Sequence, residues 1–558
     1  MTTVRVENAQ APEAAAADPK PEGIVAVETR SSLEVARRRT FAIISHPDAG
    51  KTTLTEKFLL YSGQLAVAGA VRGRKTERAA TSDWMEMERQ RGISISSTVL
   101  SFSYRGLVIN LLDTPGHRDF SEDTYRTLAA ADSAVMVIDA AKGIEEQTRK
   151  LFQVCAVRGI PILTFINKMD RDSRDPMGLL GEIEKVLGID AVPLNWPLGL
   201  GDRFTGVYDR LNRQILGFQP GERGSVLVPT QATPVPSLDQ AEELGISHAV
   251  VQELELLDEA CRPFDRARFL AGGITPVFFG SAMNNFGVEP FLQAFTELAP
   301  PPGQRGSSEG TIQPEDPLFA GQVFKIQANL NPRHRDRIAF VRVCRGRFTP
   351  ETELSIARTG EKLRIKGSHK LFARDREEVE EAFPGDILGL ASTGNLRLGD
   401  TLCEGKVFHL DPLPRFSPEC FALAICPDPG RRKQFANGLE QLANEGAVQV
   451  FLDPEAIREP ILAAVGELQF DVVRYRLRSE YGVDTEIRPL PFKAGAWVGA
   501  SMSTLKQFNL TLGVKAVTDH RGDPVLLAEN AFSIRYLTQK YPEIGLRAFS
   551  DNLFGPPQ

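Results

Sequence analysis

The feature that most constrains the fold is a regular alternation of short apolar runs and helical patterns between Arg39 and about Pro300. Five of these runs read TFAIIS, LVINLLD, AVMVID, PILTFIN and TPVFFGS. Continuous apolar runs of this length suit strands that are covered on both faces of a sheet. The helical patterns between them end at Gly63 and Gly159, and glycine is the usual left-handed cap of a helix. The alternation predicts a doubly wound α/β domain with a mainly parallel sheet.

The remainder of the 558 residues predicts further domains, since a domain takes roughly 100 to 200 residues. We expect the α/β domain over residues 33–305, with an insertion in about 171–273, a stretch that is long for one connection. Residues 316–412 show short alternating runs between Gly and Pro turns, which predicts an antiparallel β-barrel. Residues 414–558 mix strand and helix patterns and predict an α+β domain. Residues 1–32, rich in Ala, Pro and Glu, predict a disordered tail.

Composition excludes several classes of protein. No apolar run approaches the roughly 18 residues of a membrane span, and the N-terminal stretch lacks the apolar segment of a secretory signal. The six cysteines are scattered without a C-x-x-C pair, which predicts core thiols in a reducing compartment rather than a zinc or redox site. The net charge of -7 does not indicate nucleic-acid binding. The basic stretch Arg333–Arg347 either meets phosphates or forms a solvated strand face, and residues 299–310 are typical of a linker.

The stretch SHPDAGKTT after the first apolar run nearly matches the phosphate-binding pattern G-x-x-x-x-G-K-[ST], with serine in place of the first glycine. In such a loop, backbone N–H groups and the N-terminus of the next helix bind phosphate oxygens. Gly50 permits close approach, Lys51 reaches the terminal phosphates, and the Thr52 hydroxyl can bind Mg²⁺. An ordinary strand-to-helix turn is the alternative. The residues expected at the nucleotide are Ser45, His46, Pro47, Asp48, Ala49, Gly50, Lys51 and Thr52.

A second motif, LLDTPGH, follows the second run. The Asp113 carboxylate can hold a magnesium-bound water, and the Gly116 N–H can meet a γ-phosphate. By itself the pattern is weak, because turns commonly contain Asp and Gly. The residues expected at the nucleotide are Asp113, Thr114, Pro115, Gly116 and His117.

Two further motifs, FINKMD and GSA, follow later runs. The Asp170 carboxylate can accept hydrogen bonds from N1–H and the 2-amino group of guanine, whereas adenine would leave it poorly paired. Asn167 can bond the base edge, the Lys168 stem can cover the nucleotide, and backbone N–H groups of 280–282 can meet guanine O6. The residues expected here are Asn167, Lys168, Met169, Asp170, Ser281 and Ala282. Since ligands of open α/β sheets bind at the carboxyl ends of strands, the four motifs together predict a P-loop GTPase domain that binds GTP or GDP.

The order and wording of these motifs resemble the translational GTPases of the elongation factor G branch. The resemblance implies that His117, in DTPGH, is the catalytic residue that positions the attacking water, and that Ile93 and Pro47 flank its route. RQRGISI resembles the family's first switch segment. Ser94 stands where relatives carry a threonine ligand of magnesium, so the implied metal residues are Thr52, Ser94 and, through water, Asp113.

Longer stretches, including LEVARRRTFAIISHPDAGKTT, SDWMEMERQRGISI, DFSEDTYRTL and FKIQANLNPRHRDRIAF, resemble the bacterial peptide chain release factor 3 family from about Leu33 almost to the C-terminus. Only about 90 residues follow Asp471, too few for the two further domains of a translocase. The resemblance implies a cytoplasmic GTPase, monomeric off the ribosome. Without reading the stop codon, it promotes the departure of class I release factors after peptide release.

Two alternatives remain at this stage. One is a translocase-like or other ribosome-associated GTPase. The other is a GTP-sensing interaction module without hydrolysis, in which the barrel and the third domain serve as a docking surface. No residue obviously supplies an arginine finger in cis, and intrinsic rates of such proteins are about 10⁻⁴ per second. We therefore expect ribosomes to stimulate hydrolysis.

Overall fold

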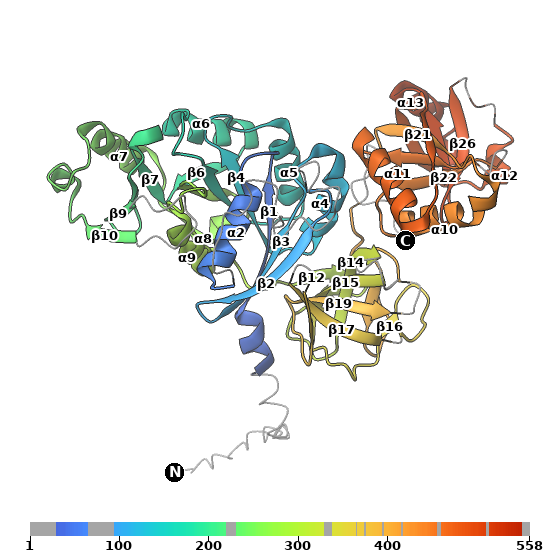
Figure 1. The fold of residues 1–558 in the computed structure, drawn as a ribbon, viewed down its shortest axis with the longest axis horizontal. Coiled ribbons are helices and arrows are strands. Elements are labelled where there is room, and N and C mark those ends of the chain that lie inside the picture. The colour runs from blue at the N-terminus through green and yellow to red at the C-terminus, as the bar shows by residue number, and fades with distance from the viewer. Residues whose placement is uncertain are drawn as a thin grey trace, which may run out of the picture.

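A computed structural model describes residues 30–64, 94–218, 230–328, 337–363, 365–372, 375–392, 396–414, 417–454, 459–508, 510 and 513–549. Three domains follow one another along the chain, with the first and largest at the left of Figure 1. The predicted multidomain fold class is confirmed. Residues 30–32, which we assigned to a disordered tail, are instead the start of a helix over residues 30–36, while residues 1–29 lie outside the described range.

The first domain is built on a seven-stranded sheet of order β2-β3-β1-β4-β5-β11-β6 (Figure 1). Alternate residues of β1 enter two different cores: Ala42 and Ile44 pack in one cluster, Phe41 and Ile43 in the other. Both faces of the sheet are therefore covered, as the apolar runs predicted. The strands are β1 (Arg38–Ser45), β2 (Thr98–Tyr104), β3 (Leu107–Asp113), β4 (Ser133–Asp139), β5 (Ile162–Asn167), β6 (Asp190–Pro193) and β11 (Ile274–Phe279).

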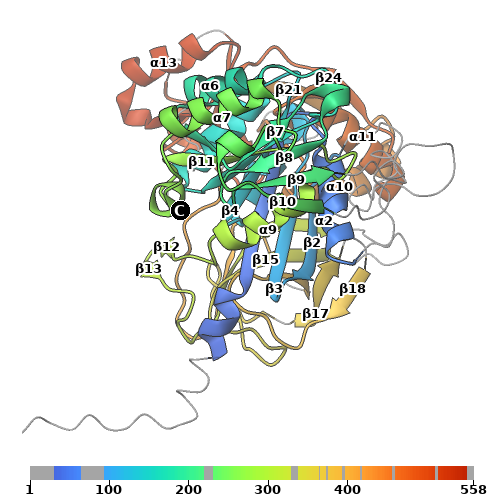
Figure 2. The same cartoon turned by 90° about the vertical axis from the view of Figure 1, so that its left-hand side faces the viewer.

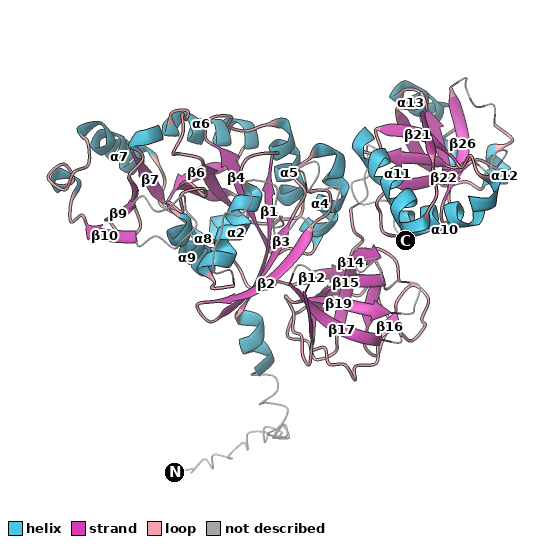
Figure 3. Cartoon of the chain, in the orientation of Figure 1, coloured by secondary structure: helices cyan, strands magenta, loops and turns pink. Residues whose placement is uncertain are grey.

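Helices cover this sheet on both faces (Figure 3). Gly63 and Gly159, which we predicted as caps, have the left-handed φ values of 76° and 63°. One strand departs from the parallel arrangement: the edge strand β2 runs antiparallel to β3. The main helices are α2 (Lys51–Tyr61), α4 (Ser121–Ala129), α5 (Glu146–Val157), α6 (Pro176–Leu187) and α9 (Val288–Leu298).

Between β6 and β11 the chain leaves the main sheet. It forms a four-stranded antiparallel sheet of order β10-β9-β8-β7, which faces the viewer in Figure 2. Its elements are β7 (Asn195–Leu198), β8 (Gly206–Asp209), β9 (Gln214–Phe218) and β10 (Thr230–Pro234), followed by α7 (His248–Ala260) and α8 (Arg266–Leu270). Trp196 of β7 is fully buried and packs edge-on against Phe279 of β11, so this unit shares the core of the main sheet.

The second domain consists of antiparallel strands joined by turns, and its strands curl around one apolar core (Figure 3). A hairpin of β12 (Arg305–Ser307) and β13 (Gly310–Ile312) precedes it, so the stretch we assigned to a linker is ordered structure. The strands are β14 (Ala320–Ala328), β15 (Arg337–Arg345), β16 (Ser355–Ile356), β17 (Ile365–Phe372), β18 (Asp375–Glu378), β19 (Ile387–Ser392) and β20 (Thr401–Cys403).

The third domain is α+β, with an eight-stranded sheet of order β24-β21-β23-β22-β26-β27-β25-β28. Its helices are α10 (Arg432–Asn444), α11 (Glu467–Tyr481), α12 (Met502–Leu505) and α13 (Ala531–Lys540). Its strands are β21 (Cys420–Ile425), β22 (Gln449–Leu452), β23 (Ile461–Ala464), β24 (Glu486–Pro489), β25 (Ala494–Val498), β26 (Val514–Asp519), β27 (Pro524–Ala528) and β28 (Leu546–Ala548).

The first and second domains meet through buried polar contacts. Asp132, at the end of the α4 segment, accepts hydrogen bonds from both Arg305 and Arg342, and its side chain is only 5% exposed. Thr40 of β1 donates to the Gly385 carbonyl at 2.6 Å. Arg38 of the same strand donates to an Asp386 carboxylate oxygen at 2.8 Å.

The described part of the basic stretch is divided between the domain interface and a solvated face, and its contact with phosphates stays a prediction. Arg342 is buried in the domain interface rather than facing solvent or phosphate. Arg337 donates to the Leu396 carbonyl, Arg345 lies over the Phe408 ring, and Arg347 pairs with Glu381. These arginines therefore stabilise the second domain and its interface.

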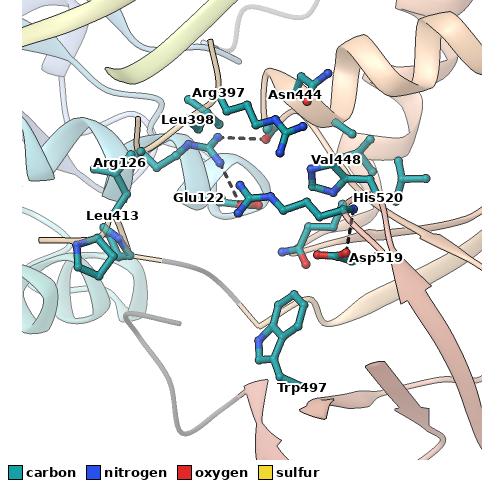
Figure 4. A pocket seen from close by; sticks show the side chains of 18 of the residues that line it. Glu122, Arg126, Arg397, Leu398, Leu413, Asn444, Val448, Trp497, Asp519 and His520 are labelled. Atoms are coloured by element: carbon teal, nitrogen blue, oxygen red, sulfur yellow. Dashed lines mark hydrogen bonds and ion pairs between the residues drawn. The ribbon is translucent and has the colours of Figure 1, made fainter. Parts of the chain in front are cut away.

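A cavity of about 120 Å³ marks the junction of the three domains (Figure 4). Arg126 of α4 pairs with Glu122 and donates to the Gly446 carbonyl of the third domain. Arg397 of the second domain and His520 of the third complete the lining on the other sides. Among the residues that the structure describes, no helix has the length and apolar character needed to cross a bilayer.

Replacing Asp132 with asparagine is expected to lower the free energy of unfolding by about 3 to 5 kcal/mol, because the buried Arg342 and the partly buried Arg305 lose their counter-charge. Urea denaturation of the full chain measures this change. Glu353→Gln is the matched control, since Glu353 and its partner Lys362 are exposed and surface pairs contribute little. Equal midpoints for the two variants would contradict a stabilising role for the Asp132 cluster.

Candidate guanine nucleotide site

The four predicted motifs lie at one edge of the main sheet. Strands β3, β1, β4, β5 and β11 are parallel neighbours, so their carboxyl ends coincide. The phosphate-binding loop follows β1, LLDTPGH ends β3, FINKMD ends β5, and GSA follows β11. The topology thus brings together segments that are separated by more than 200 residues in the sequence.

The Asn167 amide fastens two of these loops to each other. Its Nδ2 donates to the Ala49 carbonyl at 2.8 Å, and its Oδ1 accepts from the Ala282 N–H at 2.9 Å. Gly50 has a φ of 98°, and a Cβ there would lie 2.2 Å from Asn167 Nδ2, so only glycine fits. Asn167 therefore holds the phosphate loop against the loop after β11, and its contact with the base edge stays a prediction.

Lys168 lies across the top of the phosphate loop. It has a left-handed φ of 71°, and its Nζ donates to the Asp48 carbonyl at 2.5 Å and to Asp139 Oδ2 at 2.7 Å. Burial alone would raise the pKa of the Asp139 carboxyl, but hydrogen bonds from Lys168 and from the Ala141 N–H hold that pKa below its usual range. Sequence reasoning missed Asp139, although its position at the end of the run AVMVID was a signal.

Asp170 has the free acceptor that guanine recognition needs. Its Oδ1 is buried and has no hydrogen-bond partner among the residues that the structure describes. Met169, next to it, is fully buried and donates its N–H to the Gly280 carbonyl at 3.1 Å. A buried acceptor without a donor is costly, so Oδ1 is open to an N–H donor of a bound base, and guanine recognition by Asp170 stays a prediction.

The amides of residues 280–282 are engaged within the protein. They donate to the Ile166 carbonyl, the Phe286 carbonyl and Asn167 Oδ1, in that order. Ser281 also accepts from the Asn284 N–H through its hydroxyl at 3.4 Å. These bonds fix the shape of the loop, and the predicted contact of these amides with guanine O6 stays a prediction.

The phosphate end of the site carries a buried ion pair. Lys51 Nζ lies 2.7 Å from Asp113 Oδ1, while Asp113 Oδ2 is buried without a hydrogen-bond partner in the described part of the chain. Thr52 follows Lys51 in the first turn of α2. An ammonium beside an unpaired carboxylate oxygen, with a hydroxyl on the next residue of the chain, fits both phosphate and Mg²⁺.

The turn after β3 touches the phosphate loop. A Cβ on Gly116 would lie 3.5 Å from Pro47 Cα, which is ordinary contact. Thr114 donates its hydroxyl to the Ile43 carbonyl at 2.6 Å, and Pro115 accepts from the Thr124 hydroxyl at 3.2 Å. These two bonds attach the turn to β1 and to α4.

His46 supports the phosphate loop from within the protein. The side chain is buried, Nδ1 lies 2.9 Å from Glu145 Oε2, and Nε2 has no hydrogen-bond partner among the described residues. Burial lowers the pKa of His46, against the opposing effect of Glu145. Ser45 donates its hydroxyl to the His46 carbonyl at 2.9 Å. Ser45 therefore forms the turn out of β1 at the position where the general pattern has glycine.

His117 lies just outside the buried part of the site, with 33% of its side chain exposed. Its Nδ1 accepts from the Asp119 N–H at 3.3 Å and caps a short 3-10 helix, η1 (Arg118–Phe120). Ser94 lies in the extended segment before β2, where its neighbour Ile95 packs against Phe120. Residues 89–93 of the predicted first switch, with Ile93, lie outside the described range.

Comparisons with known proteins agree with this geometry. Residues 36–301 match the family described as the elongation factor Tu GTP binding domain, and residues 318–405 match elongation factor G domain 2. Residues 410–538 match the C-terminal domain of class II release factor RF3. A crystal structure of a Thermus thermophilus protein has a TM-score of 0.66 at 25% identity, covering 87% of this chain and 72% of that one. The fold and the site define a translational GTPase, which binds guanine nucleotides.

Relatives of the whole chain narrow this class. Peptide chain release factor 3 of Gloeobacter violaceus is 54% identical over 92% of this chain and 97% of its own length. The protein of the same name from Rippkaea orientalis is 51% identical over 93% of this chain and 97% of its length. The chain belongs to the peptide chain release factor 3 family. It is a ribosome-stimulated GTPase of translation termination.

Asp170→Asn is expected to weaken GTP binding by about 100-fold or more, because an amide cannot accept both N–H donors of guanine. The same variant should bind xanthosine triphosphate better than GTP, since xanthine carries a carbonyl where guanine carries its amino group. Titration calorimetry with both nucleotides measures the two affinities. Asp172→Asn, at an exposed residue two positions away, is the control. Unchanged GTP affinity in Asp170→Asn would remove Asp170 from base recognition.

Proposed function

We propose that this GTPase removes class I release factors from ribosomes after peptide release, acts without reading the stop codon, and leaves the ribosome when GTP is hydrolysed. The observation that carries the proposal is that both switch-adjacent segments are held by other domains. Lys325 of β14 donates to Ser96 Oγ at 2.6 Å, ahead of β2. Asp119, after the second motif, accepts from the Leu468 N–H of the third domain at 2.8 Å. A change at the γ-phosphate can therefore move whole domains.

In this proposal the nucleotide contacts are those of the four motifs. Lys51 and the loop 45–52 bind the phosphates, and Asp170 recognises the base. Thr52, Ser94 and, through water, Asp113 would hold Mg²⁺, which supplies positive charge against the phosphate oxygens when bound. The unpaired Asp113 Oδ2 supports this assignment. The protein works as a cytoplasmic monomer off the ribosome.

The catalytic residue of the proposal is His117. It stands at the start of η1, in the turn whose Gly116 touches the phosphate loop. From there its ring can orient a water toward a bound γ-phosphate once the ribosome orders the turn. Positioning of this kind contributes roughly 10²- to 10⁴-fold to a rate.

A reconstituted termination reaction tests the function. Ribosomes that carry a class I factor after peptide release should lose that factor faster when the protein and GTP are added. A non-hydrolysable GTP analogue should leave the protein bound to the ribosome. Stimulation of messenger RNA movement without any effect on class I factor release would favour the translocase-like alternative instead.

His117→Ala is expected to bind GTP and GDP with unchanged affinity and to lose about 100-fold or more of the ribosome-stimulated hydrolysis rate. Single-turnover phosphate release with and without ribosomes measures this loss. His248→Ala is the matched control, because His248 is an exposed histidine of α7 in the inserted unit. Normal stimulated turnover in His117→Ala would remove His117 from the catalytic role.

A further inference from the structure

The carboxylate of Asp119, a residue of the first domain, caps a helix of the third domain. Asp119 lies in η1, two residues after His117, and its side chain is 15% exposed. Its Oδ2 accepts from the backbone N–H of Leu468 at 2.8 Å. Leu468 is the second residue of α11 in the third domain. The first N–H groups of a helix have no partner inside the helix, and a carboxylate is a preferred acceptor for them.

The N-cap of α11 is a glycine, Gly466, which has no side chain of its own to offer. Its φ of -146° and ψ of 162° are open to any residue, so backbone strain does not require glycine here. The lack of space requires glycine, because a Cβ on Gly466 would lie 2.1 Å from Asp119 Cγ and 2.4 Å from each carboxylate oxygen. The Asp119 carboxylate therefore occupies the place that an N-cap side chain would take.

The other half of this cap comes from α11 itself. Gln469 Oε1 accepts from the Val465 N–H at 2.8 Å and lies 3.5 Å from the Gly466 N. A capping box normally takes both of its side chains from one helix. Here the reciprocal pair is divided between two domains, with Asp119 supplying one side and Gln469 the other.

The same residue also holds the histidine that we propose as catalytic. The Asp119 N–H donates to His117 Nδ1 at 3.3 Å, and Asp119 Oδ1 lies 3.3 Å from that nitrogen. Phe120, the next residue, packs with Ile95 against Val472 of α11. The η1 turn is thus held between its own domain and α11, with His117 Nε2 as the ring nitrogen that Asp119 does not engage.

We propose that Asp119 is a positioning residue for His117 and that the third domain sets its position through Gly466 and the N-terminus of α11. This inference rests on the proposed catalytic role of His117. When α11 is seated, the carboxylate is fixed by the Leu468 N–H, and the Asp119 backbone fixes the imidazole ring. When α11 moves, the cap is lost and the ring loses its support. The docking of the third domain and the orientation of the catalytic histidine are then thermodynamically coupled.

Gly466→Ser separates positioning from stability. Serine is a preferred N-cap, so α11 keeps or gains stability while the new side chain displaces the Asp119 carboxylate. We expect an unchanged or higher melting temperature, unchanged affinity for GTP, and a ribosome-stimulated kcat at least about tenfold lower. A purely structural role for Gly466 would make stability and activity change together. Gly499→Ala is the control, because a Cβ there makes only ordinary contact with Gly545.

Two variants of Asp119 complete the test. Asp119→Asn keeps an oxygen acceptor for the Leu468 N–H, whereas Asp119→Ala does not, so stimulated kcat should fall in the order wild type, Asn, Ala. Amide exchange at Leu468 should accelerate in Asp119→Ala and change little in Asp119→Asn. Unchanged exchange at Leu468 in Asp119→Ala would overturn the shared cap.

The outcome with His117→Ala distinguishes this inference from the function it rests on. If His117→Ala loses stimulated hydrolysis while Gly466→Ser keeps the full rate, the catalytic role stands and the positioning role of Asp119 is overturned. If His117→Ala hydrolyses GTP normally on ribosomes, the proposed catalytic role fails, and the positioning role fails with it.

Discussion

The amide of Asn167 is the contact on which the nucleotide site depends. One of its atoms binds the loop after β1 and the other binds the loop after β11, so a single buried side chain sets the separation of the phosphate end from the base end. Removing it would leave a carbonyl and an N–H unpaired in a closed environment, each at a cost of about 1 to 3 kcal/mol. The left-handed Gly50 is fitted around this amide, because a Cβ there would lie 2.2 Å from Asn167 Nδ2.

The sequence predicted those parts of the molecule that local pattern determines. Apolar runs identified β1, β3, β4, β5 and β11, and the motifs after them located the site, because parallel strands place their carboxyl ends together. The apolar pattern of the sequence could not show that β2 runs antiparallel, because the direction of a strand depends on how it pairs, here with β3. It also gave no sign that Arg342 meets Asp132, a partner 210 residues away. Glu145 was missed for the same reason, because it acts through His46, which is distant in the sequence.

The interface between the first and second domains combines apolar side chains with buried charged groups, and the charged groups constrain how the two domains can be arranged. The Asp132 carboxylate accepts a hydrogen bond from Arg342. The Lys325 ammonium donates to the Ser97 carbonyl and lies near the Asp123 carboxylate. These charged groups lie between the first domain and the second. Taking such charges out of water is expensive, and only close pairing offsets the cost. A set of paired charges strongly favours one arrangement of the two domains and becomes unfavourable when the partners separate.

The second and third domains hold different segments of the first, each beside a residue of the proposed nucleotide site. Lys325 holds Ser96 and Ser97 near the predicted magnesium ligand Ser94, while α11 holds Asp119 beside His117. Coupling of binding free energies is reciprocal. If nucleotide exchange changes how well these segments bind the outer domains, then a ribosome that holds the outer domains changes nucleotide affinity by the same factor. Under this coupling, a ribosome that fixes the position of α11 and β14 would act on the nucleotide without touching it.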